Sequence, residues 1–333
     1  MKKHGFLKVL AVLAAVYAVL IAVGTGIFWK RLDSFEKQHP VGAMNAYFAA
    51  LKNGERDKIL ADSGFPFDAV NTADAYWQYL LTKYANGEKR WQYAERPHED
   101  GATVYDVYAE NRHFGTLTLE KTDDGWRVHS DCTLTPLTVI AAAPPLLDGV
   151  SLAGFVTADA PTPVAAFDGA GGDIPATRVY RVDCLSVGTL SLPSGAALGK
   201  KDADGAVHLT AVPSDADSAA LFAFAEKTAK TYAAYISGDA AREELFALME
   251  SGTAFAGQVR AYSSYWYNKH IAIGYENLKT ETPVAWSAEA FTVDVSFDFI
   301  VRRTYDSHTY PTKYRIACRR RGDGFAVSNI LTL

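Results

Sequence analysis

Residues 49–55 read AALKNGE, and residues 233–239 read AAYISGD. Each segment follows a run of apolar residues at helical spacing and contains a glycine at the same place, Gly54 or Gly238. The first apolar stripe consists of Met44, Tyr47, Phe48 and Leu51, and the second of Leu221, Phe224, Ala225, Thr228, Tyr232 and Tyr235. Because glycine readily adopts the left-handed conformation that ends many helices, each segment predicts a helix that stops at its glycine.

A second pair of matching segments lies further along the chain, where residues 124–128 read DGWRV and residues 323–327 read DGFAV. Between the two signals, each unit carries a more polar helical stretch and then alternating runs that predict strands. The runs are 103–109, 115–121 and 126–132 in the first unit, and 291–305, 312–321 and 325–331 in the second. Helices followed by a meander predict an α+β fold, in which helices pack on one face of a curved antiparallel sheet. The two matching pairs predict that this unit occurs twice.

The middle of the chain has a different composition. Residues 137–215 contain no glutamate and no tryptophan, and short alternating runs such as 177–182 and 207–212 are separated by glycine, proline and aspartate turns. This pattern predicts a small β domain with hinges at 143–145 and 213–215. We therefore expect a first α+β unit over 41–136, a small β domain over 137–215 and a second α+β unit over 216–333.

The N-terminal region predicts a membrane anchor. Residues 9–29 contain no charged side chain, and a helix of this length spans roughly 31 Å, which matches one bilayer crossing. Three lysines precede the run, Trp29 ends it, and Lys30 and Arg31 follow it. We expect a cytoplasmic tail over 1–8, a single-pass helix over 9–29, a stalk over 30–40 and a body outside the cell membrane. A signal peptide cleaved near Gly24 and a soluble core helix are the alternatives.

Four segments in this order resemble a known family: AALKNGERDKIL (49–60), LEKTDDGWRVHSD (119–131), APPLLDGVSLAG (143–154) and GDGFAVSNI (322–330). They resemble extracytoplasmic, membrane-anchored proteins of Gram-positive bacteria related to the teicoplanin-resistance-associated TcaA family. The last unit also resembles the cystatin and nuclear-transport-factor-two-like folds, which implies a cone-shaped cavity in that unit. Those relatives often carry a cytoplasmic zinc ribbon before the membrane helix, whereas eight residues without a cysteine pair precede it here. A function that depends on the ribbon is therefore not expected.

Composition and motifs restrict the class of function. The chain of 333 residues is 49% hydrophobic and 21% charged, which fits a folded globular body and excludes disorder and a polytopic membrane protein. A net charge of −5 argues against a nucleic-acid-binding protein. Cys132, Cys184 and Cys318 are too few for a disulfide framework, although a Cys132–Cys184 bridge stays open, and Cys318 is expected to be a packed thiol.

The catalytic motifs that we sought are absent from the sequence, including nucleophile elbows, phosphate-binding loops and zinc-protease helices. Ser34 and Lys37 match S-x-x-K, but the other motifs of penicillin-recognising enzymes are missing, so a solvated stalk is the favoured interpretation. His129 and Asp131 share one strand face, and a strand pair of this kind supplies two metal ligands at most. We predict no catalytic residue, no metal and no cofactor.

Basic residues concentrate in the last predicted hairpin. The candidates for binding an anionic polymer are Arg302, Lys313, Arg315, Arg319 and Arg321, with Arg303 and Arg320 beside them. With a turn centred on residues 306–309, we expect Asp294 opposite Arg321 and Asp298 diagonal to Arg315 and Arg319. Such pairs would cancel part of the charge, so a salt-bridged solvent face is the alternative interpretation.

An aromatic run in the second unit is the favoured ligand surface. It comprises Tyr262, Tyr265, Trp266 and Tyr267. One face of a helix or strand cannot bury all four rings, and aromatic rings with polar tips suit contacts with glycans or peptides. Packing of the rings in the core is the alternative.

Three hypotheses about function follow. The first is a membrane-anchored, extracytoplasmic, non-enzymatic envelope protein that binds a partner, such as a wall polymer or another envelope protein. The second is an enzyme, of an isomerase or hydrolase type, or a small-ligand carrier that uses the cavity of the last unit. The third is a spacer that holds another chain away from the membrane. A buried carboxylate facing the cavity would favour the enzyme.

Overall fold

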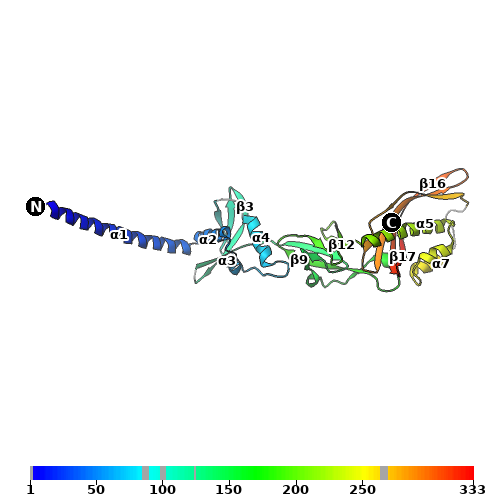
Figure 1. Ribbon diagram of the computed structural model, residues 1–333, viewed down its shortest axis with the longest axis horizontal. Helices are drawn as coiled ribbons and strands as arrows, with labels where there is room; N and C mark the ends of the chain where they lie inside the picture. The colour runs from blue at the N-terminus through cyan, green and yellow to red at the C-terminus, as the bar shows by residue number, and fades with distance from the viewer. Residues whose placement is uncertain (1–2, 85–89, 98–102, 124, 263–268) are drawn as a thin grey trace. The chain divides into compact units, whose positions relative to one another are not determined.

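The computed structural model describes residues 3–84, 90–97, 103–123, 125–262 and 269–333. They belong to two compact units, Met1–Leu134 and Thr135–Leu333, whose elements are shown in Figure 1. The predicted α+β class is confirmed, because each unit contains helices followed in the chain by an antiparallel meander.

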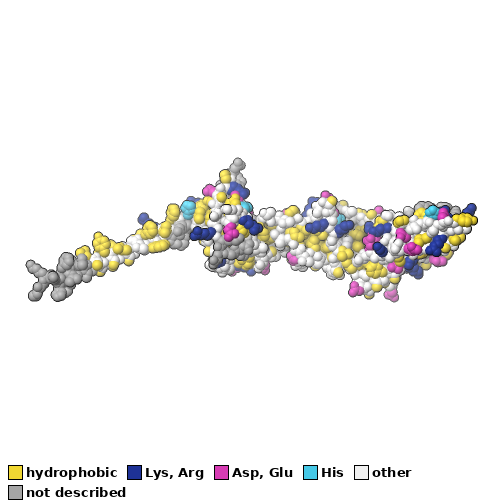
Figure 2. Space-filling view, turned by 90° about the horizontal axis from the view of Figure 1, so that it is seen from above, with side chains coloured by type: hydrophobic (Ala, Val, Ile, Leu, Met, Phe, Trp, Pro, Cys, Tyr) yellow, Lys and Arg dark blue, Asp and Glu magenta, His cyan; other side chains and the backbone are white. Residues whose placement is uncertain are grey.

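The N-terminal helix α1 (Lys3–Gln38) contains a segment long and apolar enough to span a membrane, Leu13–Leu32. Among the described side chains of this segment none is buried, and hydrophobic groups cover its surface (Figure 2). At 1.5 Å per residue, about 20 residues cross a bilayer core of roughly 30 Å, so α1 is longer than one crossing requires. The predicted stalk therefore begins as a continuation of the same helix.

The first unit continues with α2 (Pro40–Asn53), α3 (Arg56–Asp62) and α4 (Ala73–Tyr84). Four antiparallel strands follow in the order of the chain: β1 (Gln92–Arg96), β2 (Thr103–Ala109), β3 (Arg112–Thr122) and β4 (Gly125–Ser130). The apolar stripe predicted on α2 is buried, and Gly54 ends the helix with φ +75°. Met44 and Leu80 from the helices and Leu117 and Leu119 from β3 are fully buried. Packing of these side chains holds the helices against the meander.

The second unit repeats this order with longer elements. Its helices are α5 (Asp215–Ser237), α6 (Arg242–Leu248) and α7 (Ala254–Ala261). The strands are β13 (Ala272–Thr280), β14 (Val284–Ala285), β15 (Ala290–Arg302), β16 (Ser307–Arg321) and β17 (Gly324–Thr332). β15 pairs with β13, β14 and β16, and β16 pairs with β17. Gly238 ends α5 with φ +90°, as predicted.

The middle segment belongs to the same compact unit as α5–β17. Its longer strands are β5 (Thr135–Ala141), β9 (Ala176–Cys184), β11 (Ala197–Lys201) and β12 (Val207–Ala211), and its short strands are β6 (Leu146–Leu147), β7 (Val150–Ser151), β8 (Thr162–Pro163) and β10 (Leu190–Ser191). β12 pairs with β5 on one side and touches β14 through Ala211 and Ala285, so one sheet runs through both segments. The strands predicted at 177–182 and 207–212 are present.

Residues 164–173, which we call the latch segment, connect the middle segment to the last one. Phe167, in the 3₁₀ turn η2 (Ala165–Phe167), is fully buried and packs with Ala290 and Ala317 of β15 and β16. The Gly169 carbonyl accepts a hydrogen bond from the Ala254 amide at 2.8 Å. Gly169 adopts φ +72°, and a Cβ atom there would lie 2.7 Å from the Ala254 side chain. The glycines of this segment therefore allow close packing of the latch.

The register predicted for the β15–β16 hairpin is wrong. Its turn comprises residues 303–306, closed by a 2.8 Å hydrogen bond from the Arg303 amide to the Asp306 carbonyl, and Arg302 pairs with Ser307. Because the turn lies about three residues earlier than predicted, the residues after Asp306 extend the second strand. Asp294 consequently lies opposite Arg315 instead of Arg321.

Candidate functional site

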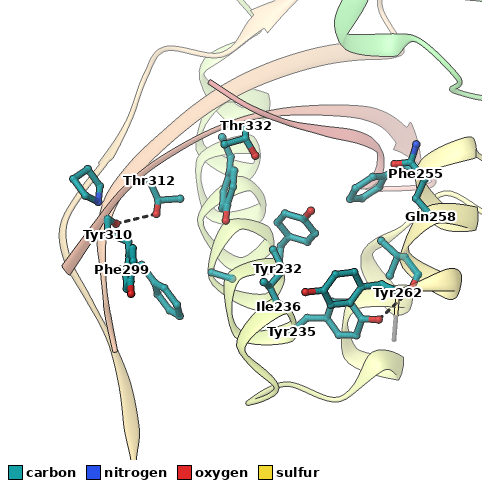
Figure 3. Close-up of a pocket in the computed structure, with 14 residues that line it drawn as sticks. Tyr232, Tyr235, Ile236, Phe255, Gln258, Tyr262, Phe299, Tyr310, Thr312 and Thr332 are labelled. Atoms are coloured by element: carbon teal, nitrogen blue, oxygen red, sulfur yellow. Dashed lines mark hydrogen bonds between the residues drawn. The ribbon is translucent and has the colours of Figure 1, made fainter. Parts of the chain in front are cut away.

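A cavity of about 610 Å³ lies on the concave side of the second unit's sheet, between α5, α7 and the strands β15–β17 (Figure 3). The α5 and α7 side is lined by Tyr232, Ala233, Tyr235, Ile236, Phe255, Gln258, Val259 and Tyr262. The sheet side is lined by Phe299, Tyr310, Pro311, Thr312, Tyr314 and Thr332. This volume falls within the range of ordinary small-ligand pockets.

Helical spacing places the tyrosines of α5 in the wall. Tyr232 and Tyr235 are three residues apart, so both project from the same side of the helix. The ring of Tyr232 lies 5.3 Å from the ring of Tyr314 and 5.7 Å from that of Phe255, measured between centroids. The Tyr235 hydroxyl donates a 3.0 Å hydrogen bond to the Val259 carbonyl. The aromatic wall is thus fixed by contacts between α5, α7 and β16 before any ligand arrives.

The chemistry of the wall is neutral. None of the fourteen residues that line the cavity in the described part of the chain carries a carboxylate, an amine, a guanidinium or an imidazole. Burial raises the pKa of Tyr232, so its hydroxyl keeps its proton at physiological pH. The wall therefore offers aromatic faces together with hydroxyl and amide groups for hydrogen bonding.

Of the four predicted aromatic residues, Tyr262 lines this cavity, and its ring lies 6.1 Å from that of Tyr235. Tyr265, Trp266 and Tyr267 lie outside the described residues. No sequence pattern predicted that Phe299, Tyr310 and Tyr314 would line a cavity. Their even spacing with other apolar residues of β15 and β16 predicts a buried strand face, and Phe299 and Tyr314 are indeed buried, so periodicity does not distinguish wall from core.

Most of the predicted basic patch has intramolecular partners. Arg315 donates to both carboxylate oxygens of Asp294 at 2.7 and 2.8 Å, and Lys313 donates to Glu281 at 2.8 Å. Arg319 and Arg321 donate to backbone carbonyls, those of Asp173 (2.6 Å) and Ala247 (3.1 Å) respectively. Arg302 is exposed at the hairpin end, without an ion pair among the described residues. Arg319 also pairs with Glu250 at 3.8 Å, and Arg320 pairs with Asp217 at 3.0 Å. Among the basic residues of β16, Arg321 is therefore left without an ion pair to a described residue.

Other candidates from the sequence do not converge. The side chains of Ser34 and Lys37 lie outside those that the structure describes. Asp131 accepts hydrogen bonds from Thr116 and Thr118, and no group of three potential metal ligands occurs among the described residues. Cys132, Cys184 and Cys318 are free thiols. Burial raises the pKa of Cys318 to about 12, which keeps it protonated and unreactive.

Comparison with known proteins adds little to this geometry. No family model matches the sequence, and no curated protein matches it. Among solved structures, the chain is similar to an Ntf2-like protein involved in plasmid conjugation, with 8% sequence identity and a TM-score of 0.26. That likeness covers 73% of this chain and 75% of the other. At this level of similarity, the function has to be argued from the cavity.

Proposed function

We propose that this protein is a membrane-anchored, non-enzymatic binding protein that holds an uncharged, largely apolar ligand or partner segment in the cavity of its second unit. The observation that carries this proposal is the neutral, aromatic wall of the 610 Å³ cavity. Aromatic faces gain free energy by covering apolar ligand surface, and the hydroxyl groups orient the ligand. The enzyme hypothesis needs an ionisable group at the wall, and the described lining residues contain none with an ordinary pKa near neutrality.

The location proposed for this activity is outside the cell membrane, with α1 as a single-pass anchor and the N-terminus in the cytoplasm. The apolar segment Leu13–Leu32 supports the anchor. Protease added to intact cells should digest the body and leave α1 in the membrane fraction. Recovery of a shortened protein from the medium would instead indicate cleavage near Gly24.

Site-specific photocrosslinking of the full chain in its native membrane tests the binding proposal. A benzophenone amino acid in place of Gln258, an exposed residue that lines the cavity, should form adducts. The matched control carries the same group in place of Lys227, which is exposed on α5 outside the cavity lining. Filling the cavity with Ile236→Trp should abolish the adducts at position 258 while a thermal melt shows that the chain remains folded. Equal adducts at the two positions, or none at 258, would contradict the proposal.

A further inference from the structure

A second hollow lies on the other face of the sheet, where the middle segment meets the last one. It has a volume of about 470 Å³, and we call it the trough. Lys200, Lys201, Asp202 and His208 line it from the β11–β12 side. Glu281, Thr282, Val284, Trp286, Thr292, Asp294 and Arg315 line it from the β14–β16 side. The trough exists because β12 and β14 join one sheet, so both sides belong to one compact unit.

The acidic side chains of the trough all have partners. Asp294 is nine-tenths buried and binds Arg315 through both oxygens. Glu281 binds Lys313, and Asp202 lies 3.1 Å from Nε2 of His208. These three pairs hold the carboxylates of the trough in place before a ligand binds.

One cation on this face is left over. Lys200 is exposed, and it forms no ion pair with a described residue. It lies directly opposite His208 in the β11–β12 pairing, which places the two side chains on the same face of the sheet, whereas Lys201 pairs with Val207 and its side chain starts from the opposite face. An exposed ammonium group without an ion pair at the edge of a hollow attracts an anion.

The other end of the trough is aromatic. The indole N–H of Trp286 donates a 3.0 Å hydrogen bond to the hydroxyl of Thr292, which fixes the ring. The ring is only partly buried and lines the trough. A fixed indole face packs well against the C–H face of a sugar ring, while Thr282 and the paired carboxylates present acceptors for sugar hydroxyls.

We propose that the trough binds an acidic sugar unit of an anionic glycan, with the sugar ring against Trp286 and its carboxylate on the ammonium group of Lys200. The site is separate from the aromatic cavity, and its occupancy does not depend on the cavity's ligand. It also differs from the basic patch on β16, because its free charge comes from β11.

Binding measurements on the full chain in nanodiscs of zwitterionic lipid test the proposal. The probes are carboxymethyl dextran, neutral dextran of the same length and polyglutamate. Carboxymethyl dextran should bind at least ten-fold more tightly than either of the others. The variant Lys200→Gln should weaken its binding about ten-fold, and Trp286→Phe should weaken it several-fold by shrinking the platform.

The matched control, Arg302→Gln, removes the same charge at the exposed end of the β15–β16 hairpin and should leave binding unchanged. Equal loss in the two charge variants would mean that the whole surface attracts anions, which overturns the site. Equal affinity for polyglutamate would contradict the proposal that the ligand is a sugar. No binding of carboxymethyl dextran at millimolar concentration would contradict both the sugar and the site.

Discussion

In the first unit, α2 ends at Gly54, and the last hairpin closes where Thr122 pairs with Gly125. In the second unit, α5 ends at Gly238, and the last hairpin closes where Arg321 pairs with Gly324. The two helix ends have the same pattern of hydrogen bonds. The amide of Glu55 donates to the Ala50 carbonyl, and the amide of Asp239 donates to the Ala234 carbonyl, each five residues back in the pattern of a Schellman cap.

The interiors of the two units differ because their elements differ in length. α2 has 14 residues and α5 has 23, while β2 has 7 and its counterpart β15 has 13. In the first unit, rings such as Phe48, Tyr84 and Trp91 pack against one another, and a pocket of about 240 Å³ lies between α2, α3 and β4. In the second, Phe299 and Tyr310 line the cavity of about 610 Å³. Cap and hairpin signals thus set the order of the elements, and the unit with the longer elements holds the larger of these two cavities.

The largest effect is expected from a substitution in the latch segment of the second unit. Phe167→Ala should destabilise the second compact unit by about 3–5 kcal/mol, because it removes a fully buried ring from between β15, β16 and η2. Urea-dependent hydrogen exchange of α5 and β16 measures this loss. Phe67→Ala in the first unit, where the ring is 42% exposed, is the control and should leave α5 and β16 unchanged. A loss below about 1 kcal/mol for Phe167→Ala would contradict the role of the latch.

The next effect tests whether the two caps are equivalent. Gly54→Ala and Gly238→Ala should each cost about 1–2 kcal/mol, because alanine is strained at positive φ. Exchange in α2 and in α5 reports each loss separately. Gly257→Ala, within α7 where a Cβ meets no neighbour, is the control and should stabilise by roughly 0.5–1 kcal/mol. If the two losses differ by more than about 1 kcal/mol, the two helix caps are not equivalent.

These caps were predictable because the information is local. An apolar stripe followed by a glycine identifies a helix and its end within about 15 residues, and the strands of both final hairpins show a two-residue alternation that periodicity detects. The β15–β16 register was not predictable in the same way. The turn at Arg303–Asp306 contains no glycine, so the sequence carried no signal to separate it from a turn three residues later.

The latch, the cavity and the trough depend on contacts between distant segments. The need for glycine at position 169 arises from the side chain of Ala254, 85 positions away, so no local pattern indicates it. Tyr232 and Tyr235 belong to the apolar stripe predicted for α5, and that stripe does not reveal which of its residues face a cavity instead of the packed core. Lys200 and Trp286 lie in different predicted domains, so no local pattern could place them in one trough.

A third prediction concerns the interior of the first unit. The hydroxyl of Tyr47 is buried without a hydrogen-bond partner among the described residues, so Tyr47→Phe should stabilise the first unit by about 1 kcal/mol. Burial also raises the pKa of Tyr47 well above its usual value. The unfolded chain releases this proton first as the pH rises above about 10, so wild-type stability should fall there and the variant should fall less.

Exchange in α2 between pH 7 and pH 11, corrected for the intrinsic rate, measures this difference. Tyr305→Phe, at a side chain that is 98% exposed, is the control and should change neither the stability nor its pH dependence. A parallel decline for Tyr47→Phe and wild type would show that this hydroxyl is solvated in the folded state.

The smallest expected effect lies at the helix starts, where the two units differ. The hydroxyl of Ser214 caps α5 by accepting a 3.2 Å hydrogen bond from the Asp217 amide, whereas His39 at the start of α2 makes no side-chain cap. Ser214→Ala should therefore cost about 1 kcal/mol in the second unit, and His39→Ser should gain up to about 1 kcal/mol in the first. Hydrogen exchange of the backbone amides in the first turn of each helix measures both changes. His39 already has the extended backbone of a cap residue, with φ −95° and ψ 135°, so serine needs no rearrangement there. No gain for His39→Ser, alongside a clear loss for Ser214→Ala, would mean that α2 begins as a continuation of α1, which supplies the contacts that a cap would otherwise make.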